Sequence, residues 1–436
     1  MSNLARFFLS KGVAVSGYDR VATELTDNLI NEGAKIHFED DLSSIGDVDK
    51  IDLVVYTPAI PNENNQLTYF KNSSITVVKR AELLGLITKN SYSIAIAGTH
   101  GKTTTSCIIA HMLEDSGLGC NAFLGGISTN YNSNFIINKN TDRTVVEADE
   151  YDRSFLNLSP DISIITSMDP DHLDIYGARD EMDKSFQDFV ELIKKEGKLI
   201  VHYGLPVDHE NKLTYGENEN ADLVIRNINI KDGNYHFDVQ FKDIEIKDIY
   251  LGLPGRHNVF NAASAILLSL ELGMDINMIK SSLASFKGVK RRFEYKLKSK
   301  DIVYIDDYAH HPKELEVCIE SARELYPNKI LTGIFQPHLY SRTRDFLAEF
   351  AVSLSALDEV ILLDIYPARE LPISGISSEL LLEKINCNNK KLMKMQEVVP
   401  EIENRYIEVL LSMGAGNIDE LVQPIKKALE NKMEII

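Results

Sequence analysis

The sequence has no long apolar segment. Apolar runs such as residues 361–363 and 266–268 are short and interrupted by polar or charged residues, whereas a membrane-spanning helix needs about 20 largely apolar residues in a row. The first residues also lack the layout of a secretory signal peptide. We therefore expect a protein that stays in the cytoplasm and does not span a membrane.

Cysteine is also scarce. The four cysteines lie far apart in the sequence and do not have the close spacing of metal-ligand pairs. Proteins of the cytoplasm keep their thiols reduced, so these residues are expected to act as small, mostly buried apolar side chains. The pattern predicts no zinc site and no disulfide framework. The four residues are Cys107, Cys120, Cys318 and Cys387.

Positive charge is in deficit. The chain has 46 lysines and arginines against 65 aspartates and glutamates, which gives a net charge of -19. A surface of this sign argues against nucleic acid and against an anionic membrane as partners. It still allows a local basic pocket for a small anionic substrate.

What the chain does have is a regular alternation of strand and helix patterns over 436 residues. This alternation predicts an α/β protein with parallel sheets covered by helices, and the length favours about three domains. We place the domains at residues 1–89, 90–292 and 293–436. Residues 1–12 read as a helix with an apolar stripe of Leu4, Phe7 and Phe8. A doubly wound domain normally begins with a strand and a glycine-rich turn before such a helix.

The most informative segment is residues 92–105, where an apolar strand runs into Gly98-Thr99-His100-Gly101-Lys102-Thr103-Thr104 and then a helix. Backbone N–H groups and the positive end of a helix dipole form a cradle for phosphate. Lys102 can neutralise phosphate oxygens, and the hydroxyl of Thr103 can hold Mg²⁺. Two residues separate the glycines, where the common motif has four. The alternative is a tight turn with an exposed lysine, and in either case we expect Lys102 outside the core.

Acidic residues follow the next two predicted strands. Because the carboxyl ends of parallel strands share one edge of a sheet, these groups should lie beside the phosphates. Carboxylates and a neutral imidazole are suitable ligands for one or two Mg²⁺ ions. The alternative is a solvated acidic loop and a histidine that caps a helix. The residues are Glu147, Asp149 and Glu150 after one strand, and Asp169, Asp171 and His172 after the other.

Two further segments carry polar groups. Asn258 and Asn261 lie three residues apart at the start of a helix of small residues, where their amides can read a base edge or merely cap the helix. In the third domain, residues 306–312 and 336–344 follow two adjacent strands and contain several histidines and arginines. Their position at two strand ends favours a binding face over a set of unrelated surface charges.

Together these motifs resemble those of the Mur ligase family. The resemblance spans essentially the whole chain, and the runs Tyr-Ala-His-His-Pro and Gly-Val-Lys-Arg-Arg-Phe-Glu are specific for the branch that uses L-alanine. The matching segments are Gly-Thr-His-Gly-Lys-Thr-Thr at 98–104, Glu-Ala-Asp-Glu at 147–150, Asp-His-Leu-Asp at 171–174, Pro-Gly-Arg-His-Asn at 254–258, Gly-Val-Lys-Arg-Arg-Phe-Glu at 288–294, Asp-Asp-Tyr-Ala-His-His-Pro at 306–312, Gln-Pro-His at 336–338 and Met-Gly-Ala-Gly-Asn at 413–417.

The resemblance implies a Rossmann-like N-terminal domain for a UDP-sugar, a central P-loop ATPase domain with a parallel sheet, and a Rossmann-like C-terminal ligase domain. It implies ATP and Mg²⁺ as cofactors and UDP-N-acetylmuramate and L-alanine as substrates of peptidoglycan synthesis. ATP would phosphorylate the sugar carboxylate, and the amine would then attack the acyl phosphate. Charge on the transferred phosphoryl group must be balanced during this reaction.

Carried over by position, the resemblance assigns a role to each candidate residue. Gly98, Thr99, His100, Gly101, Lys102, Thr103 and Thr104 would bind phosphate. Glu150, or as second choice Glu147, would join Thr103 at the first Mg²⁺, and His172 would hold the second. Asn258 and Asn261 would contact adenine, and Arg292 a phosphate. The alanine end would be lined by Tyr308, His310, His338 and Arg342, and Asp19 would lie on the nucleotide side.

The chain departs from the family pattern at two places. Leu339 stands where many members have arginine, so one cationic contact is absent or is made by Arg342 or Arg344. The family also begins with a strand and a Gly-Ile-Gly-Gly-Ile-Gly-Met-Ser turn, and Met1 and Ser2 match only its end. We therefore expect the first strand of the N-terminal domain to be missing and nucleotide affinity to be weakened.

Three functions stay open from the sequence. The first is the alanine-adding ligase. The second is a related ligase that recycles a murein tripeptide. The third is a catalytically silent ATP-binding protein, suggested by the missing glycine turn. The sequence does not distinguish a monomer from a dimer.

Overall fold

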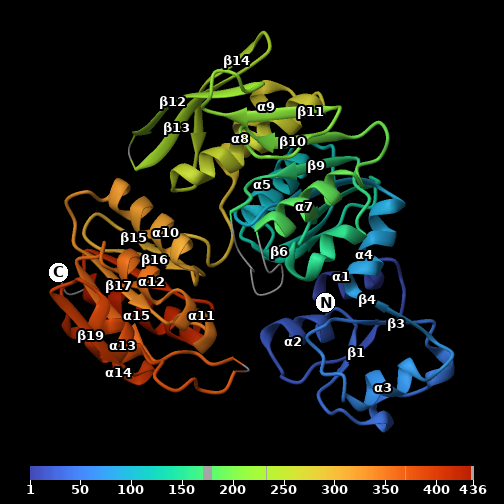
Figure 1. Cartoon of the computed structure of the whole chain (residues 1–436), viewed down its shortest axis with the longest axis horizontal. Helices are drawn as coiled ribbons and strands as arrows, with labels where there is room; N and C mark the ends of the chain where they lie inside the picture. Colours follow the sequence, from blue (N-terminus) through green and yellow to red (C-terminus); the bar gives the residue numbers. More distant parts are fainter. Residues whose placement is uncertain (170–178, 232, 369, 434–436) are drawn as a thin grey trace. The chain divides into compact units, whose positions relative to one another are not determined.

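The computed structural model describes all residues except 170–178, 232, 369 and 434–436 (Figure 1). It confirms an α/β fold in which helices alternate with mostly parallel strands. By its internal packing the chain divides into two compact units. One contains Met1–Arg226, Asp238–Lys247 and Phe260–Phe286, and the other contains Asn227–Phe237, Asp248–Val259 and Lys287–Ile436. The boundaries at residues 89 and 292 between three domains stay a prediction.

The N-terminal segment begins with the expected amphipathic helix. Leu4 of α1 is buried, and Phe7 and Phe8 pack against the core that contains Phe123 and Phe135 of the central sheet. The strands that follow pair as two separate parallel sheets, β1 with β2 and β3 with β4. The elements are α1 (Ser2–Ser10), β1 (Ser16–Tyr18), α2 (Glu24–Asn31), β2 (Lys35–His37), η1 (Leu42–Ile45), η2 (Val48–Lys50), β3 (Leu53–Tyr56), α3 (Asn65–Lys71), β4 (Thr76–Lys79) and α4 (Arg80–Lys89).

The central sheet has the order β14-β13-β12-β11-β10-β9-β5-β8-β6-β7. Strand β5 lies between β9 and β8 and is parallel to both, so the loop after β5 opens among the carboxyl ends of its neighbours. The elements are β5 (Tyr92–Ala97), α5 (Lys102–Asp115), β6 (Asn121–Ser128), β7 (Ser133–Ile136), β8 (Arg143–Glu147), η3 (Tyr151–Asn157), β9 (Ile162–Ile165), α7 (Arg179–Val190), β10 (Lys198–His202), β11 (Lys212–Gly216), β12 (Leu223–Lys231), β13 (Asn234–Phe241), β14 (Ile244–Leu251), α8 (Arg256–Glu271) and α9 (Ile276–Ser285).

The sheet of the predicted third domain, called the third sheet below, has the order β15-β16-β20-β17-β18-β19, with β15 antiparallel and the other strands parallel. Its two faces bury separate cores, one around Phe335 and Phe350 and the other around Tyr304 and Ile425. The elements are β15 (Glu294–Lys298), β16 (Val303–Asp307), α10 (Pro312–Leu325), β17 (Leu331–Phe335), α11 (Tyr340–Asp345), α12 (Leu347–Leu354), β18 (Glu359–Leu363), α13 (Ser378–Lys384), β19 (Asn389–Met393), α14 (Met395–Asn404), β20 (Val409–Met413), η4 (Asn417–Leu421) and α15 (Val422–Met433).

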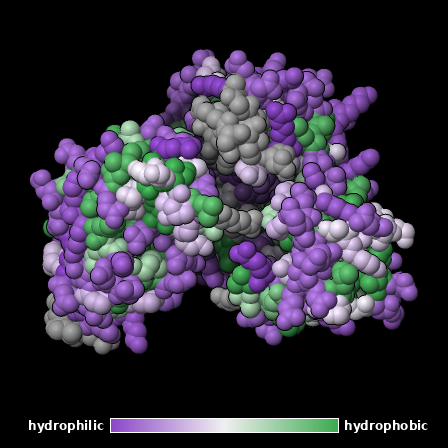
Figure 2. Space-filling model, turned by 60° about the horizontal axis from the view of Figure 1, so that its bottom comes forward, coloured by the Kyte–Doolittle hydropathy of each residue, from purple (hydrophilic) through white to green (hydrophobic). Residues whose placement is uncertain are grey.

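The surface shown in Figure 2 is mostly hydrophilic, and its apolar residues lie in separate small groups. No helix in the described part of the chain has both the length and the apolar character needed to cross a membrane.

Candidate active site

The phosphate loop has the predicted strand–turn–helix geometry. Gly98 and Gly101 have φ angles of 131° and 84°, a region that favours glycine. A Cβ atom at Gly98 would lie 2.2 Å from Thr166 Oγ1, and one at Gly101 would lie 2.6 Å from Asn261 Oδ1. Both glycines are therefore required by backbone conformation and by close packing. The loop is further held by Ser167, whose Oγ accepts from the N–H of His100 at 2.8 Å.

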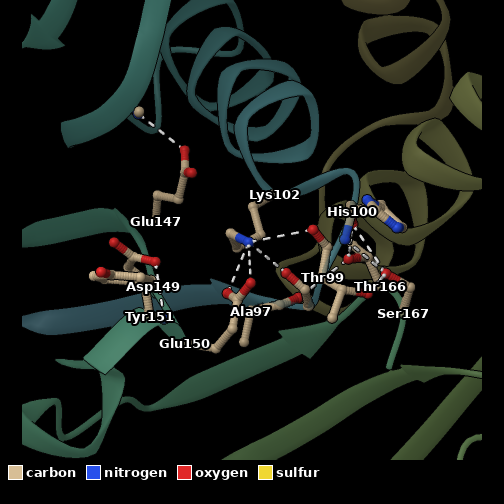
Figure 3. Close-up of polar contacts among 12 residues, drawn as sticks. Ala97, Thr99, His100, Lys102, Glu147, Asp149, Glu150, Tyr151, Thr166 and Ser167 are labelled. Carbon is tan, nitrogen blue, oxygen red and sulfur yellow. Dashed lines mark hydrogen bonds and ion pairs between the residues drawn. The ribbon is translucent and has the colours of Figure 1, made fainter. Parts of the chain in front are cut away.

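Lys102, expected in the loop and outside the core, is the first residue of α5, and its side chain is largely buried against the loop, unlike the exposed lysine of the alternative reading. Its Nζ donates to the carbonyl oxygen of Gly98 at 2.6 Å and to Glu150 Oε1 at 2.8 Å (Figure 3). The side chains of Lys102 and Glu150 are only 14% and 2% exposed. Burial alone would lower the pKa of Lys102, but the adjacent Glu150 and Glu147 carboxylates raise it above its ordinary value. The ammonium group is therefore charged and neutralised by a carboxylate.

Glu147 contacts Thr103, whose hydroxyl is also a candidate Mg²⁺ ligand. Thr103 Oγ1 donates to Glu147 Oε2 at 2.9 Å, and the N–H of Gly125 donates to the same oxygen at 2.9 Å. Burial raises the pKa of Glu150, against the opposing effect of Lys102. The structure thus places Thr103 beside Glu147, the second choice for the carboxylate ligand of the first Mg²⁺. Glu150, the first choice for that ligand, pairs with Lys102.

A hard cation fits this set of oxygen atoms. The Thr103 hydroxyl and the two carboxylates are ligands that Mg²⁺ accepts, and Mg²⁺ usually keeps several waters as well. Within the described residues no group of three or more His, Cys, Asp and Glu side chains forms a ready-made metal cluster. His172, predicted at the second metal ion, lies outside the described residues.

The two asparagines of α8 have different surroundings. Asn258 Nδ2 donates to the carbonyl oxygen of Pro254 at 2.6 Å, which is not the bond of an N-cap, because a capping side chain accepts from a backbone N–H. Asn261 packs its amide oxygen against Gly101 of the phosphate loop. Both side chains are buried. Contact with adenine stays a prediction for both.

Aromatic and cationic groups gather at the ends of β16 and β17. The ring of His310 lies 5.2 Å from that of Tyr308 and 6.1 Å from that of His338, measured between ring centroids. The Arg292 guanidinium lies 5.4 Å from the centre of the Tyr308 ring. The structure therefore brings four of the predicted residues together.

The two histidines of this group are held neutral. Burial lowers the pKa of His310, and the cations Arg342 and Arg292 lower it further, against the Glu314 carboxylate and the Tyr308 carbonyl. Burial, His310 and Arg342 lower the pKa of His338 to about 4. His338 Nδ1 is buried and has no hydrogen-bond partner in the described part of the chain. An unpaired buried nitrogen of this kind is available to a ligand.

Leu339 has strained backbone geometry, with a φ angle of 71°. Its N–H donates to the carbonyl oxygen of Tyr366 at 2.9 Å, which fixes the turn between His338 and α11. Left-handed geometry at a bulky residue is costly and is often found at functional sites. Arg344 is exposed and pairs with Asp345, so Arg342 is the arginine of this segment that influences the two histidines.

The sequence pattern missed several residues of this region. Asp307 accepts the N–H groups of Phe293 and Ala309 at 2.6 and 2.7 Å, and burial raises its pKa to about 6. Arg291 donates to Asp306 at 3.1 Å and to the carbonyl oxygen of Gly414 at 2.7 Å. The doubled Asp306-Asp307 at a strand end was the available signal. Asp19 lies after β1, where its carboxylate accepts from the N–H of Val21 at 3.3 Å, and its nucleotide role stays a prediction.

Comparison with known proteins identifies relatives along the whole chain. Family models match three consecutive parts: the Mur ligase family catalytic domain at residues 1–92, the Mur ligase middle domain at 96–269, and the Mur ligase glutamate ligase domain at 291–417. The UDP-N-acetylmuramate–L-alanine ligases of Christiangramia forsetii and Parabacteroides distasonis are 50% and 48% identical. Each alignment covers 98% of this chain and 95% of the relative.

Solved structures agree. A UDP-N-acetylmuramate-alanine ligase from Thermotoga maritima matches with a TM-score of 0.82 and 26% identity, over 100% of this chain and 97% of that one. A murein peptide ligase from Psychrobacter arcticus matches with a TM-score of 0.69 and 21% identity, over 99% and 96%, which supports the fold alone. The chain, an α/β protein with a phosphate loop at its central sheet, therefore belongs to the Mur ligase family.

Proposed function

We propose that this protein joins L-alanine to UDP-N-acetylmuramate while ATP is split to ADP and phosphate. The substrates are those named for a relative that is 50% identical over 98% of this chain. The observation that carries the proposal is the buried Lys102–Glu150 pair at the start of α5, beside Thr103 and Glu147. This is a site for a nucleoside triphosphate and a divalent cation.

The reaction needs an activated carboxylate. A carboxylate oxygen of the sugar attacks the terminal phosphorus of ATP, ADP leaves, and an acyl phosphate remains. The amine of L-alanine then attacks the acyl carbon, loses a proton, and expels phosphate. Mg²⁺, held by Thr103 with Glu147 or Glu150, would neutralise charge on the phosphate oxygens.

The chain's own residues have separate tasks in this scheme. Lys102 exchanges part of its bonding to Glu150 for phosphate oxygens, and the backbone N–H groups of residues 98–104 orient the phosphates. The neutral rings of His310 and His338, with Tyr308 and the cations Arg292 and Arg342, receive the amino acid. Uncharged imidazoles suit this place because the attacking amine must be unprotonated. Both ATP and a UDP-sugar are cytoplasmic metabolites, so we propose that the enzyme works there.

The test is an assay of ADP release by the purified protein with ATP, Mg²⁺, UDP-N-acetylmuramate and L-alanine. We expect release that depends on both co-substrates and a product whose mass equals the two joined substrates less water. A parallel assay replaces L-alanine with the murein tripeptide. Preference for the tripeptide, or ATP binding without turnover, would overturn the proposal.

A further inference from the structure

Glu314, the third residue of α10, makes more contacts than a helix cap requires. Its Oε2 accepts from the backbone N–H groups of His310 at 3.0 Å and His311 at 3.2 Å. The same oxygen lies 3.1 Å from His310 Nδ1. Its Oε1 lies 3.5 Å from Arg292 Nη1. A capping box needs only the bond to the N–H of His311, the N-cap residue.

These contacts fix the tautomer of His310. Besides Glu314, the carbonyl oxygen of Tyr308 lies 3.0 Å from His310 Nδ1. Both neighbours of this nitrogen are acceptors, so Nδ1 carries the proton. Because burial keeps the ring neutral, Nε2 has no proton and presents a lone pair.

The same carboxylate also orders a cation. Arg292 belongs to the segment between α9 and β15, where Arg291 and Phe293 on either side have left-handed φ angles of 59° and 45°. The Arg292 guanidinium contacts both Glu314 and the face of the Tyr308 ring. One side chain thus joins the start of α10 to this segment.

We propose that Glu314 is a positioning residue for the amino-acid end of the site. It holds His310 as the Nδ1–H tautomer, so that Nε2 accepts an N–H of the incoming amine, and it orients Arg292 beside Tyr308. This inference rests on the proposed function. Its alternative is that Glu314 only caps α10.

The experiment compares Glu314→Gln with Glu316→Gln. Glu316 lies on the same helix and pairs with Lys313 at the surface, so it is a matched control outside the site. The glutamine keeps an oxygen for the backbone N–H groups but loses the charge that faces His310 and Arg292. We expect the KM for L-alanine to rise about tenfold in Glu314→Gln, as expected for a lost charge-assisted hydrogen bond, and the KM for ATP to change less than about twofold.

A pH profile gives a second readout. Glu314 raises the pKa of His310, whereas burial, Arg342 and Arg292 lower it, and the ring also faces Tyr308 and His338. Activity requires the neutral ring, so Glu314→Gln should move the acidic limb of kcat/KM to lower pH. A cap-only residue would lower melting temperature and active fraction, and would leave this limb and the KM values in place. Equal KM values for L-alanine in the two variants would overturn the proposal.

The third readout does not depend on activity. Nitrogen-15 NMR of histidine-labelled protein, with His310 assigned through His310→Gln, reports which ring nitrogen is protonated. We expect the Nδ1–H form in the wild type and in Glu316→Gln, and a loss of this preference in Glu314→Gln. An Nε2–H form in the wild type would overturn the inference. Failure of the wild type to release ADP with L-alanine would instead overturn the proposed function.

Discussion

The phosphate loop and the strand-end site of the third sheet hold their polar groups in opposite ways. At the phosphate loop, charged groups neutralise one another in a buried position: Lys102 pairs with Glu150. At the ends of β16 and β17, burial and nearby arginines keep His310 and His338 uncharged. The first region thus keeps its charged groups in an internal ion pair, whereas the second keeps its titratable imidazoles uncharged.

Under the proposed function, this difference matches what each region would bind. A triphosphate is a strong anion, and its binding would exchange part of the Lys102–Glu150 contact for contacts with phosphate oxygens. A buried ion pair contributes little net stability, but removal of one partner is costly. An amine nucleophile needs acceptors and no added positive charge, which neutral imidazoles provide.

The largest expected effect comes from Lys102→Met. Without the ammonium group, charge on the transferred phosphoryl group loses a stabilising contact, and we expect ADP release to fall about a thousandfold. The carboxylate of Glu150 is also left buried without its lysine. The melting temperature should therefore fall, because the folded state loses about 3 kcal/mol of stability. Protonation of Glu150 would make this loss smaller. Steady-state kinetics and thermal unfolding measure the two effects.

The double variant Lys102→Met with Glu150→Gln separates the effect on activity from the effect on stability. It removes both charges, so stability should largely return while activity stays lost. If the double variant is as unstable as Lys102→Met alone, the buried pair does not account for the stability effect. If Lys102→Met retains activity, the phosphate role of this residue is wrong.

A smaller effect is expected from Gly101→Ala. Gly101 and Gly117 stand before and after α5 with similar φ angles of 84° and 78°, but a Cβ atom would meet Asn261 Oδ1 at Gly101 and nothing within 4 Å at Gly117. The left-handed backbone alone should cost alanine about 1–2 kcal/mol of stability at either site, and the cost should be larger at Gly101, where Asn261 must also shift. Only Gly101→Ala should also weaken ATP binding, by about tenfold or more. Titration calorimetry of both variants checks this, and equal ATP affinities would contradict it.

The same contrast explains what the sequence could predict. The phosphate loop was predictable because glycine spacing and the strand-to-helix transition are local features of residues 92–105. The burial of Lys102 was not, because its partner Glu150 follows β8, and only the pairing of β5 with β8 places the two side by side. The choice between Glu147 and Glu150 as the partner of Thr103 depends on the same register.

In the third sheet, strand ends predicted that Tyr308, His310 and His338 would meet. The protonation state of the histidines was not predictable, since it depends on burial and on Arg342, which a linear pattern does not reveal. Glu314 was hidden because a glutamate at the third position of a helix is an ordinary capping signal.

The smallest expected effect concerns the charge that keeps the histidines neutral. Arg342 lowers the pKa of both His310 and His338, and Glu370 acts in the opposite sense on His338. Removing a cation raises the pKa of a nearby imidazole, so Arg342→Gln should move the acidic limb of kcat/KM to higher pH, by about half a unit to one unit. Arg323→Gln is the control, because Arg323 pairs with Asp358 near the opposite end of α10. Its acidic limb should coincide with that of the wild type. A limb that stays in place in Arg342→Gln would mean that burial alone keeps the imidazoles uncharged, and the contrast between the two regions would then rest on desolvation rather than on neighbouring charge.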